Sequence, residues 1–412
     1  MKILVINCGS SSIKYRVFAS KSAGNPEDLA GGTVSGLGQP GAMLEHEFQG
    51  RSLAWKLDRP DHGQGLASIM EVLLHPEHGP LKDLSEVRLV GHRTVHGGEG
   101  FNSAVVIGQE VIAKIERCIP LAPIHNPANL EGIRQAQTLL PKATHVAVFD
   151  TAFHQTLPAR AFVYALPYEL YQQHGIRRFG FHGTSCRYVS QRAAELNGLP
   201  LKKSRMVICH LGNGVTVAAV QNGCSIDTSL GFTPLEGAMM GTRCGDLDPG
   251  VVLYLQRELG MSLAQVDEML NRQSGLLGLS GCSNDMRELI QAADDGDRQC
   301  ALAVEMFIYR LKKYIGAYAA AMGGIDTLIF TGGIGENSPR IRELVLKGLD
   351  FLGIELDPQL NADPGQEDRI ISQQGARVVV TVVYTKEELM IAREALALVR
   401  NDVHCAALCA AG

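Results

Sequence analysis

Two stretches of this chain, about 200 residues apart, share one pattern: a strand, a glycine-rich turn and a returning strand. The first covers residues 2–18 with its turn at 7–12, and the second covers residues 206–220 with its turn at 212–214. An Asn-Gly dipeptide between apolar runs, as in the second turn, is typical of a β-hairpin. Repetition of this unit predicts an internal duplication, with one hairpin in each half of an α/β chain.

The size and composition of the chain favour a folded protein with more than one domain. Its 412 residues exceed what a single hydrophobic core usually holds. Apolar residues make up 45% and charged residues 20%, which is typical of packed globular proteins. The 45 glycines point to many tight turns or to close approach of the backbone to a ligand.

Charge and hydropathy argue against several classes of partner. The net charge is −5 and no run of Lys or Arg occurs, so we expect no nucleic acid partner. The longest apolar stretches, such as residues 378–383, have the length of strands, so we expect no membrane partner. The ten cysteines include no C-x-x-C pair, which argues against zinc and favours a reducing cytoplasm.

Three glycine-rich turns follow predicted strands, at residues 7–12, 212–214 and 332–337. Backbone N–H groups in such turns can approach a phosphate closely, and the first turn adds serine hydroxyls and, two residues beyond it, Lys14. The third is expected to be a loop that ends at the N-cap Ser338 of a helix, where exposed N–H groups favour an anion. Each turn alone is a weak signal and no Walker A sequence occurs, but together the three turns predict a nucleotide phosphate site.

Charged side chains follow other predicted strands. A buried strand at residues 145–149 ends at Asp150, and the carboxyl end of a strand is the usual place for chemistry in an open α/β sheet. Arg93 lies in a Gly- and His-rich segment after a strand, and Arg243 lies between two glycines. A guanidinium can hold a carboxylate or phosphoryl oxygens through two parallel hydrogen bonds. Taken singly, each arginine is also compatible with a structural ion pair.

Nine segments of the chain resemble, in order, the signature motifs of the acetokinase family, which comprises the acetate kinases and their close relatives the propionate kinases. The first reads Val-Ile-Asn-Cys-Gly-Ser-Ser-Ser-Ile-Lys, and the second reads Gly-His-Arg-Thr-Val-His-Gly-Gly around Arg93. The nine segments are residues 5–14, 91–98, 122–127, 149–154, 178–185, 210–214, 241–250, 330–337 and 387–389. These segments are distributed over essentially the whole chain, from residue 5 to residue 389.

The resemblance implies an α/β protein with the two-domain fold of the sugar kinases, heat-shock chaperones and actin. Each domain is built on a ribonuclease-H-like core, and the nucleotide lies in the cleft between the domains. We expect an N-terminal domain over residues 1–150, completed by a C-terminal helix at 386–400. A C-terminal, nucleotide-binding domain is expected over residues 151–385, with a loose tail at 401–412.

The resemblance also implies four catalytic residues: Asp150, His182, Arg243 and Arg93. Arg93 is expected to hold the acceptor carboxylate, while Arg243 and His182 contact the phosphoryl group in transfer. The role of Asp150 stays open between a general base and an organiser of charge. A simple carboxylic acid has a pKa of about 4, so it is ionised at neutral pH and needs no deprotonation. We therefore expect Asp150 to orient a magnesium-bound water or the arginines.

Metal and nucleotide positions are carried over in the same way. Asn7 and Glu387 match the Mg²⁺ positions of the family, with Mn²⁺ as a further candidate, and Mg²⁺ takes few protein ligands. The residues expected to contact ATP or ADP are Ser10, Ser12, Lys14, His210, Leu211, Gly212, Asn213, Gly214, Asp285, Met286, Arg287, Gly333, Ile334, Gly335, Glu336 and Asn337.

A small apolar pocket is expected to select the acid. Its residues, besides Arg93, are Val95, Ile124, Phe181 and Pro234. The position of Val95 is valine in the acetate kinases and alanine in the propionate kinases. One methylene group in a tight pocket is worth about 1–3 kcal/mol, so the resulting preference for acetate is partial.

The activity implied is reversible, Mg²⁺-dependent, in-line transfer of a phosphoryl group from ATP to acetate, which gives acetyl phosphate and ADP. A propionate kinase or a broader short-chain carboxylate kinase is the near alternative. A sugar or polyol kinase would need a true general base, and a filament subunit or chaperone-like ATPase would have no use for the two arginines. The family also implies a homodimer.

Overall fold

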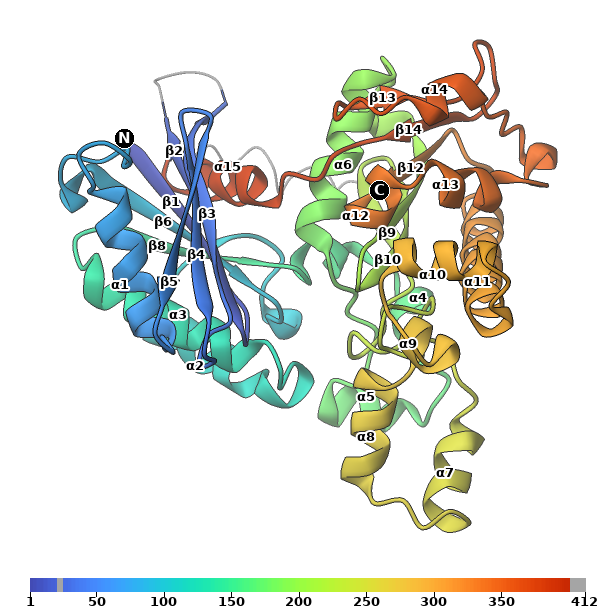
Figure 1. Ribbon diagram of the computed structural model, residues 1–412. Helices are drawn as coiled ribbons and strands as arrows, with labels where there is room; N and C mark the ends of the chain where they lie inside the picture. The colour runs from blue at the N-terminus through green and yellow to red at the C-terminus, as the bar shows by residue number, and fades with distance from the viewer. Residues whose placement is uncertain (21–24, 401–412) are drawn as a thin grey trace. The chain divides into compact units, whose positions relative to one another are not determined.

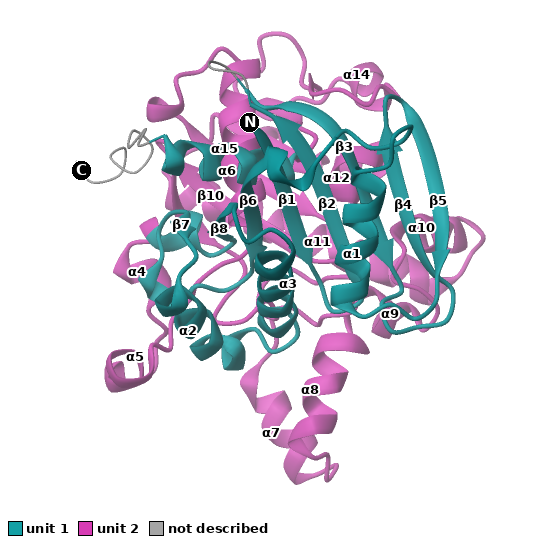
Figure 2. Cartoon of the chain, turned by 90° about the vertical axis from the view of Figure 1, so that its left-hand side faces the viewer, with its two compact units in different colours: residues 1–155, 386–412 teal, residues 156–385 magenta. Residues whose placement is uncertain are grey.

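The computed structural model describes residues 1–20 and 25–400, and the chain divides into two compact units (Figure 1). Unit 1 is Met1–Gln155 together with Lys386–Gly412, and unit 2 is Thr156–Thr385 (Figure 2). The predicted loose tail at 401–412 lies outside the described residues, and the domain division drawn from the sequence stays a prediction. No helix in the described part of the chain is long and apolar enough to cross a membrane.

Unit 1 is built on an eight-stranded sheet with the order β5-β4-β3-β2-β1-β6-β8-β7. Its strands are β1 (Lys2–Cys8), β2 (Ser12–Ala19), β3 (Glu27–Ser35), β4 (Ala42–Phe48), β5 (Arg51–Leu57), β6 (Val87–Thr94), β7 (Val105–Val106) and β8 (Thr144–Phe149). Its helices are α1 (His62–Leu73), α2 (Gln109–Arg117), α3 (Asn126–Leu139) and α15 (Glu387–Val399). Strands β1 to β5 pair antiparallel, whereas β1, β6 and β8 run parallel.

The alternation of side chains along β1 explains why both faces of this sheet are covered. Leu4 and Ile6 join the cluster that packs against α1 and α3, whereas Ile3 and Val5 join the cluster that packs against α15. Successive strand residues point to opposite faces, so a strand with apolar residues at every position must be buried on both sides. The C-terminal helix α15 is therefore part of the core of unit 1 (Figure 1).

Unit 2 carries a six-stranded sheet with the order β11-β10-β9-β12-β14-β13. Its strands are β9 (Arg205–Leu211), β10 (Val215–Gln221), β11 (Cys224–Thr228), β12 (Thr327–Thr331), β13 (Arg369–Ile370) and β14 (Val379–Val382). Its helices are α4 (Ala159–Phe162), α5 (Tyr168–His174), α6 (Gly183–Leu196), α7 (Pro249–Arg257), α8 (Leu263–Arg272), α9 (Gly275–Ser280), α10 (Met286–Asp294), α11 (Arg298–Ala321), α12 (Gly332–Asn337), α13 (Pro339–Leu346) and α14 (Pro358–Ala362).

The two sheets repeat one strand order, which confirms the duplication predicted from the two hairpins. In unit 1 the hairpin β1–β2 is followed by an antiparallel strand β3, and β6 and β8 add in parallel on the other side of β1. In unit 2 the hairpin β9–β10 is followed by antiparallel β11, and β12 and β14 add in parallel beside β9. Each unit thus has parallel strands whose carboxyl ends lie side by side, and functional groups can gather at these ends.

The third glycine-rich turn differs from its prediction. The loop expected at residues 332–337 is the short helix α12, and Gly332 enters it with a φ of +75°. The Glu336 carboxylate accepts hydrogen bonds from the Gly332 N–H and the Thr331 hydroxyl, which closes the turn on itself. The start of the next helix is as predicted, because Ser338 is the N-cap of α13 and accepts from the Ile341 N–H.

Candidate active site

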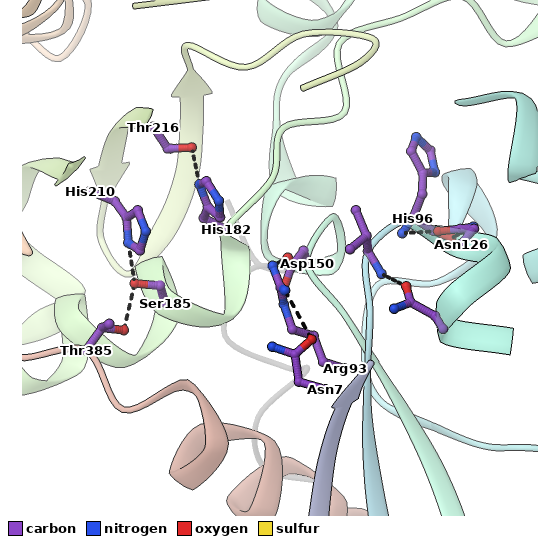
Figure 3. A network of polar contacts seen from close by, with 12 residues as sticks. Asn7, Arg93, His96, Asn126, Asp150, His182, Ser185, His210, Thr216 and Thr385 are labelled. Atoms are coloured by element: carbon purple, nitrogen blue, oxygen red, sulfur yellow. Dashed lines mark hydrogen bonds and ion pairs between the residues drawn. The ribbon is translucent and has the colours of Figure 1, made fainter. Parts of the chain in front are cut away.

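Three polar side chains of unit 1 meet at the carboxyl edge of its parallel strands (Figure 3). Asn7 lies near the end of β1, Arg93 near the end of β6, and Asp150 directly after β8. These strands are neighbours in the order β1-β6-β8, so their ends lie side by side. The fold therefore brings together residues that are 57 and 86 positions apart in the chain.

Asp150 holds the guanidinium of Arg93 along one edge. Arg93 Nη2 donates to Asp150 Oδ2 over 2.6 Å and Nε donates to Oδ1 over 3.4 Å, while Nη1 donates to Asn7 Oδ1 over 3.3 Å. Asp150 is only 1% exposed. Charge-assisted, two-point pairing of this kind fixes the plane of a guanidinium. The arrangement suits Asp150 to orienting Arg93.

Carboxylates surround the same guanidinium. Burial acts to lower the pKa of Arg93, but Asp150 and Glu387 outweigh it, so the pKa is raised and the charge is secure. Burial raises the pKa of Glu387 to about 7, with Asp150 and Glu388 adding to the rise and Arg93 and Lys14 opposing it. Burial and the neighbouring carboxylates disfavour the ionised form of Glu387, and a nearby cation would stabilise that form.

The oxygen donors of Asn7 and Glu387 fit a Mg²⁺ ion chemically. One is an amide oxygen and the other a desolvated carboxylate, and hard divalent cations prefer such ligands. Within the described residues, no cluster of three or more His, Cys, Asp or Glu side chains is arranged to hold a metal. Two oxygen donors suffice for Mg²⁺, because the ion keeps most of its waters and takes few protein ligands.

Two buried amides, neither of which was predicted as a site residue, hold the segment that follows Arg93. Asn129 Oδ1 accepts from the Val95 N–H over 3.0 Å, and its Nδ2 donates to the Cys8 carbonyl over 2.7 Å. Asn126 accepts from the His96 N–H over 3.1 Å and donates back to the His96 carbonyl over 3.0 Å. Their spacing of three residues on α3 places both on one helix face, and that is the signal by which they could have been found.

In unit 2, two histidines stack beside the second hairpin (Figure 3). The rings of His182 and His210 have centroids 4.5 Å apart and planes 23° apart. His182 Nδ1 lies 2.9 Å from the hydroxyl of Thr216, and His210 Nδ1 lies 2.9 Å from that of Ser185. His182 adopts a left-handed backbone with a φ of +56° at the start of α6. Such a conformation is uncommon for residues other than glycine and is concentrated at functional sites.

Gly214 marks the point at which His182 and Arg243 converge. A Cβ atom added to Gly214 would lie 3.2 Å from His182 Cε1, 3.5 Å from Nε2 and 3.8 Å from Arg243 Nη1. Glycine therefore keeps open a space that an imidazole and a guanidinium both border. Arg243 Nη1 makes a long contact of 3.4 Å with the Pro234 carbonyl, and burial lowers its pKa. No carboxylate in the part of the chain that the structure describes pairs with Arg243.

Asn213, at the tip of the same turn, joins this site to the next loop. Its carbonyl accepts from the Gly241 N–H over 3.0 Å, and its side-chain oxygen accepts from Asn284 Nδ2 over 2.9 Å. Asp285 then caps α10 and pairs with Arg287, which lowers the pKa of Asp285 to about 2. The structure thus connects the second hairpin, the Arg243 segment and the predicted adenosine segment within one unit.

The remaining predicted residues fall in both units. The hairpin tip of unit 1 exposes Ser10, while Ser12 and Lys14 lie on β2. Leu211 ends β9, and Gly212 donates its N–H to the Gly214 carbonyl. The other nucleotide residues lie on α10 and α12: Met286, Gly333, Ile334, Gly335 and Asn337. Of these, Met286 is buried, so its side chain packs inside unit 2.

The residues predicted for the acid pocket also divide between the units. Val95 is buried in unit 1, and Ile124 is half-buried just before α3 of that unit. Phe181 is buried in unit 2, where Pro234 is half-buried. The substrate role of all four stays a prediction. Among the residues predicted to contact the nucleotide, Glu336 already has partners. Its carboxylate also accepts the Thr385 N–H over 2.9 Å, so its hydrogen bonds are made within unit 2.

Comparison with known proteins gives matches along nearly the whole chain. The model of the acetokinase family matches residues 2–393. An acetate kinase of Caldanaerobacter subterraneus subsp. tengcongensis is 50% identical over 403 residues, which is 97% of this chain and 100% of the relative. The crystal structure of Porphyromonas gingivalis acetate kinase is 48% identical, with a TM-score of 0.90 and coverage of 97% of this chain and 99% of its own.

A propionate kinase is also similar to this chain. The structure from Francisella tularensis subsp. tularensis SCHU S4 is 40% identical, with a TM-score of 0.88 and coverage of 96% of this chain and 99% of its own. Together with the repeated sheet order, these matches confirm the α/β, duplicated fold class expected from the sequence.

Proposed function

The chain belongs to the acetokinase family, and from this membership we propose how its own residues carry out the reaction. It is a phosphotransferase with a carboxyl group as acceptor, and it phosphorylates acetate with ATP. The observation that carries the proposal is the convergence of Arg243 and His182 at Gly214. A half-buried guanidinium without a carboxylate partner among the described residues has the chemistry of an anion site.

Arg243 and His182 hold the phosphoryl group during transfer. The charge that develops on the transferring group is spread over three oxygens, so donors that are already in place lower the barrier. Arg243 supplies two N–H groups and a full charge, and His182 supplies a ring N–H. Gly214 leaves room for the oxygens between them. Transfer is direct and in line, and it is reversible.

Arg93 holds the acetate carboxylate. A guanidinium has five N–H groups. Asp150 takes two of them and Asn7 a third, which leaves one on each terminal nitrogen, Nη1 and Nη2, for a carboxylate. Acetate arrives ionised at neutral pH, because its pKa is about 4. Asp150 therefore acts as a positioning residue that aims Arg93, with no proton to remove.

Asn7 and Glu387 are the residues that would hold Mg²⁺, with Mn²⁺ as a substitute. When bound, the ion neutralises charge on the phosphates of ATP. Ser10, Ser12 and Lys14 from the first hairpin and the turn at residues 212–214 are the proposed phosphate contacts. The segments around Asp285 and α12 are the proposed contacts of the adenosine. We also propose a homodimer and a cytoplasmic location, as the family resemblance implies.

Val95 supports acetate as the preferred acid. It is buried, and Asn129 holds its backbone, so the side chain has little freedom to withdraw from a longer substrate. The similar propionate kinase keeps the alternative open, namely a propionate kinase or a broader short-chain carboxylate kinase.

Trapping with hydroxylamine tests the assignment. The protein is incubated with ATP, Mg²⁺ and acetate, propionate or butyrate, and the hydroxamate formed from the acyl phosphate is measured. We expect kcat/KM to fall in the order acetate, propionate, butyrate. A higher kcat/KM with propionate would establish the alternative, and consumption of ATP with a sugar but no hydroxamate would contradict a carboxylate acceptor.

A further inference from the structure

Two thiols of unit 2 lie in contact with each other. Cys282 Sγ and Cys300 Sγ are 3.5 Å apart. Cys282 is exposed in the segment between α9 and α10, whereas Cys300 is buried in the first turn of α11. Both are free cysteines. A disulfide has an S–S length of about 2.05 Å, so the sulfur atoms need to approach by roughly 1.5 Å to form one.

The segment that carries Cys282 is held by local hydrogen bonds, most of which involve the side chains of Ser280 and Ser283. The Ser280 hydroxyl accepts the N–H groups of Cys282 and Ser283, each over 3.3 Å. Two residues later, Asn284 donates to Asn213, and Asp285 opens α10. Cys282 therefore lies three positions before Asp285, the first residue of the segment proposed to bind adenosine, and a disulfide at Cys282 would restrain that segment.

We propose that Cys282 and Cys300 form an oxidisable thiol pair, which a low-molecular-weight disulfide converts into an intramolecular disulfide. In the first step the Cys282 thiolate attacks the reagent, forms a mixed disulfide and releases one thiol. In the second step the Cys300 thiolate attacks Cys282 Sγ and releases the second thiol. Two cysteine thiols are oxidised, the reagent disulfide is reduced to two thiols, and the cysteine protons end on these products.

The environments of the two thiols decide the order of the steps. Cys282 is exposed and can meet a reagent in solution, whereas Cys300 is buried. Burial raises the pKa of Cys300 to about 11, and Cys282 and Asp297 add to the rise. Because the thiolate is the attacking species, Cys300 reacts poorly with reagents in bulk solution. It acts as the resolving thiol, since Cys282 Sγ is already beside it.

Oxidation restrains the segment between α9 and α10 against the first turn of α11. If this segment contacts adenosine, a consequence that rests on the proposed function, the oxidised protein has a raised KM for ATP. The contact between Asn284 and Asn213 transmits the restraint to the second hairpin. We expect a rise in KM of about threefold or more, reversed by dithiothreitol.

Trypsin separates the two cysteines cleanly. Cleavage at Arg272, Arg287, Arg298 and Arg310 gives the peptides 273–287 and 299–310, which contain Cys282 and Cys300 as their single cysteines. The full chain is treated with oxidised glutathione, alkylated, digested and examined by mass spectrometry. We expect a linked pair of these two peptides that dithiothreitol separates.

Two variants and a control sharpen the result. Cys282→Ser should abolish the linked pair, and Cys300→Ala should instead leave glutathione attached to peptide 273–287. Cys118→Ala, which alters a buried cysteine of unit 1, should keep the linked pair. Absence of the linked pair in the wild type, together with no glutathione on Cys300→Ala, would overturn the proposed thiol pair. If the linked pair forms but the KM for ATP is unchanged, the proposed effect of the disulfide on ATP binding is wrong, whereas the proposed disulfide itself stands.

Discussion

Asp150 and Arg93 are joined by two hydrogen bonds, of which the shorter, from Nη2 to Oδ2, spans 2.6 Å. The carboxylate is almost fully buried, and the guanidinium side chain is 19% exposed. The pair therefore fixes one edge of the guanidinium, while part of the Arg93 side chain stays exposed. This geometry supports the proposal that Asp150 positions the Arg93 guanidinium and does not act as a base.

Replacing Asp150 by Asn should lower kcat/KM for acetate by about 100-fold, because small displacements of a positioned group have effects of that size. The loss should depend on Arg93. In a double-mutant cycle, Asp150→Asn should cost little once Arg93→Ala is present, since the group that Asp150 positions is gone. Independent, additive losses would contradict the positioning role.

Replacing Val95 by Ala should raise the ratio of kcat/KM for propionate over acetate. The space of the lost methyl groups accommodates one more methylene, and such a difference is worth about 10- to 200-fold. The two acids are compared under the same conditions, with Ile107→Val as a control because Ile107 is a buried residue of the same unit outside the predicted pocket. An unchanged ratio in Val95→Ala would remove Val95 from the pocket.

Thr216 should position His182 through its hydroxyl. Thr216→Val keeps the volume but removes the contact with Nδ1, so kcat should fall by about 10-fold, the equivalent of one hydrogen bond of about 1–1.5 kcal/mol. Thr216→Ser keeps the hydroxyl and should restore most of kcat. KM for acetate should change little in either variant. Equal loss in both variants would indicate that packing, and not the hydroxyl, is what matters.

The features that the sequence predicts are mostly those that depend on residues close together in the chain. The hairpins and Asp150 were predictable because strand alternation, Gly turns and strand ends are local patterns. The convergence of Asn7, Arg93 and Asp150 depends on the order β1-β6-β8, which no local pattern contains. The helix α12 was missed although its closing contact from Gly332 to Glu336 is local, because glycine is a poor helix former and three of its six residues are glycine. Thr216 and Asn129 were missed because their partners are 34 positions away.

Buried histidines should make unit 1 sensitive to acid. Burial is the largest cause of the lowered pKa of His46, His92, His96 and His145, and the pKa of His96 falls to about 4. In the unfolded chain the pKa is about 6.5, so between pH 6.5 and 4 the unfolded state binds more protons. Stability is therefore fully present above pH 6.5 and is lost as the pH falls toward 4.

The size of this effect can be measured for His96. The difference between a pKa of about 6.5 and one of about 4 corresponds to about 2 kcal/mol of lost stability at pH 5. Urea unfolding at pH 7 and pH 5 should show the loss as a lower midpoint. The His96 ring signal, assigned by its disappearance in His96→Gln, should not titrate between pH 8 and pH 5. A titration centred near pH 6.5 would contradict its burial as a neutral ring.

The central claim is that Arg243, which has no carboxylate partner in the described part of the chain, stabilises the phosphoryl group in transfer. The most direct measurement is kcat for hydroxamate formation from acetate and ATP in Arg243→Ala. The control is Arg340→Ala, which removes an exposed arginine of the same unit paired with Asp294. We predict a loss of kcat of at least about 1,000-fold in Arg243→Ala and less than about twofold in the control. A kcat for Arg243→Ala within about twofold of the wild type would contradict the account.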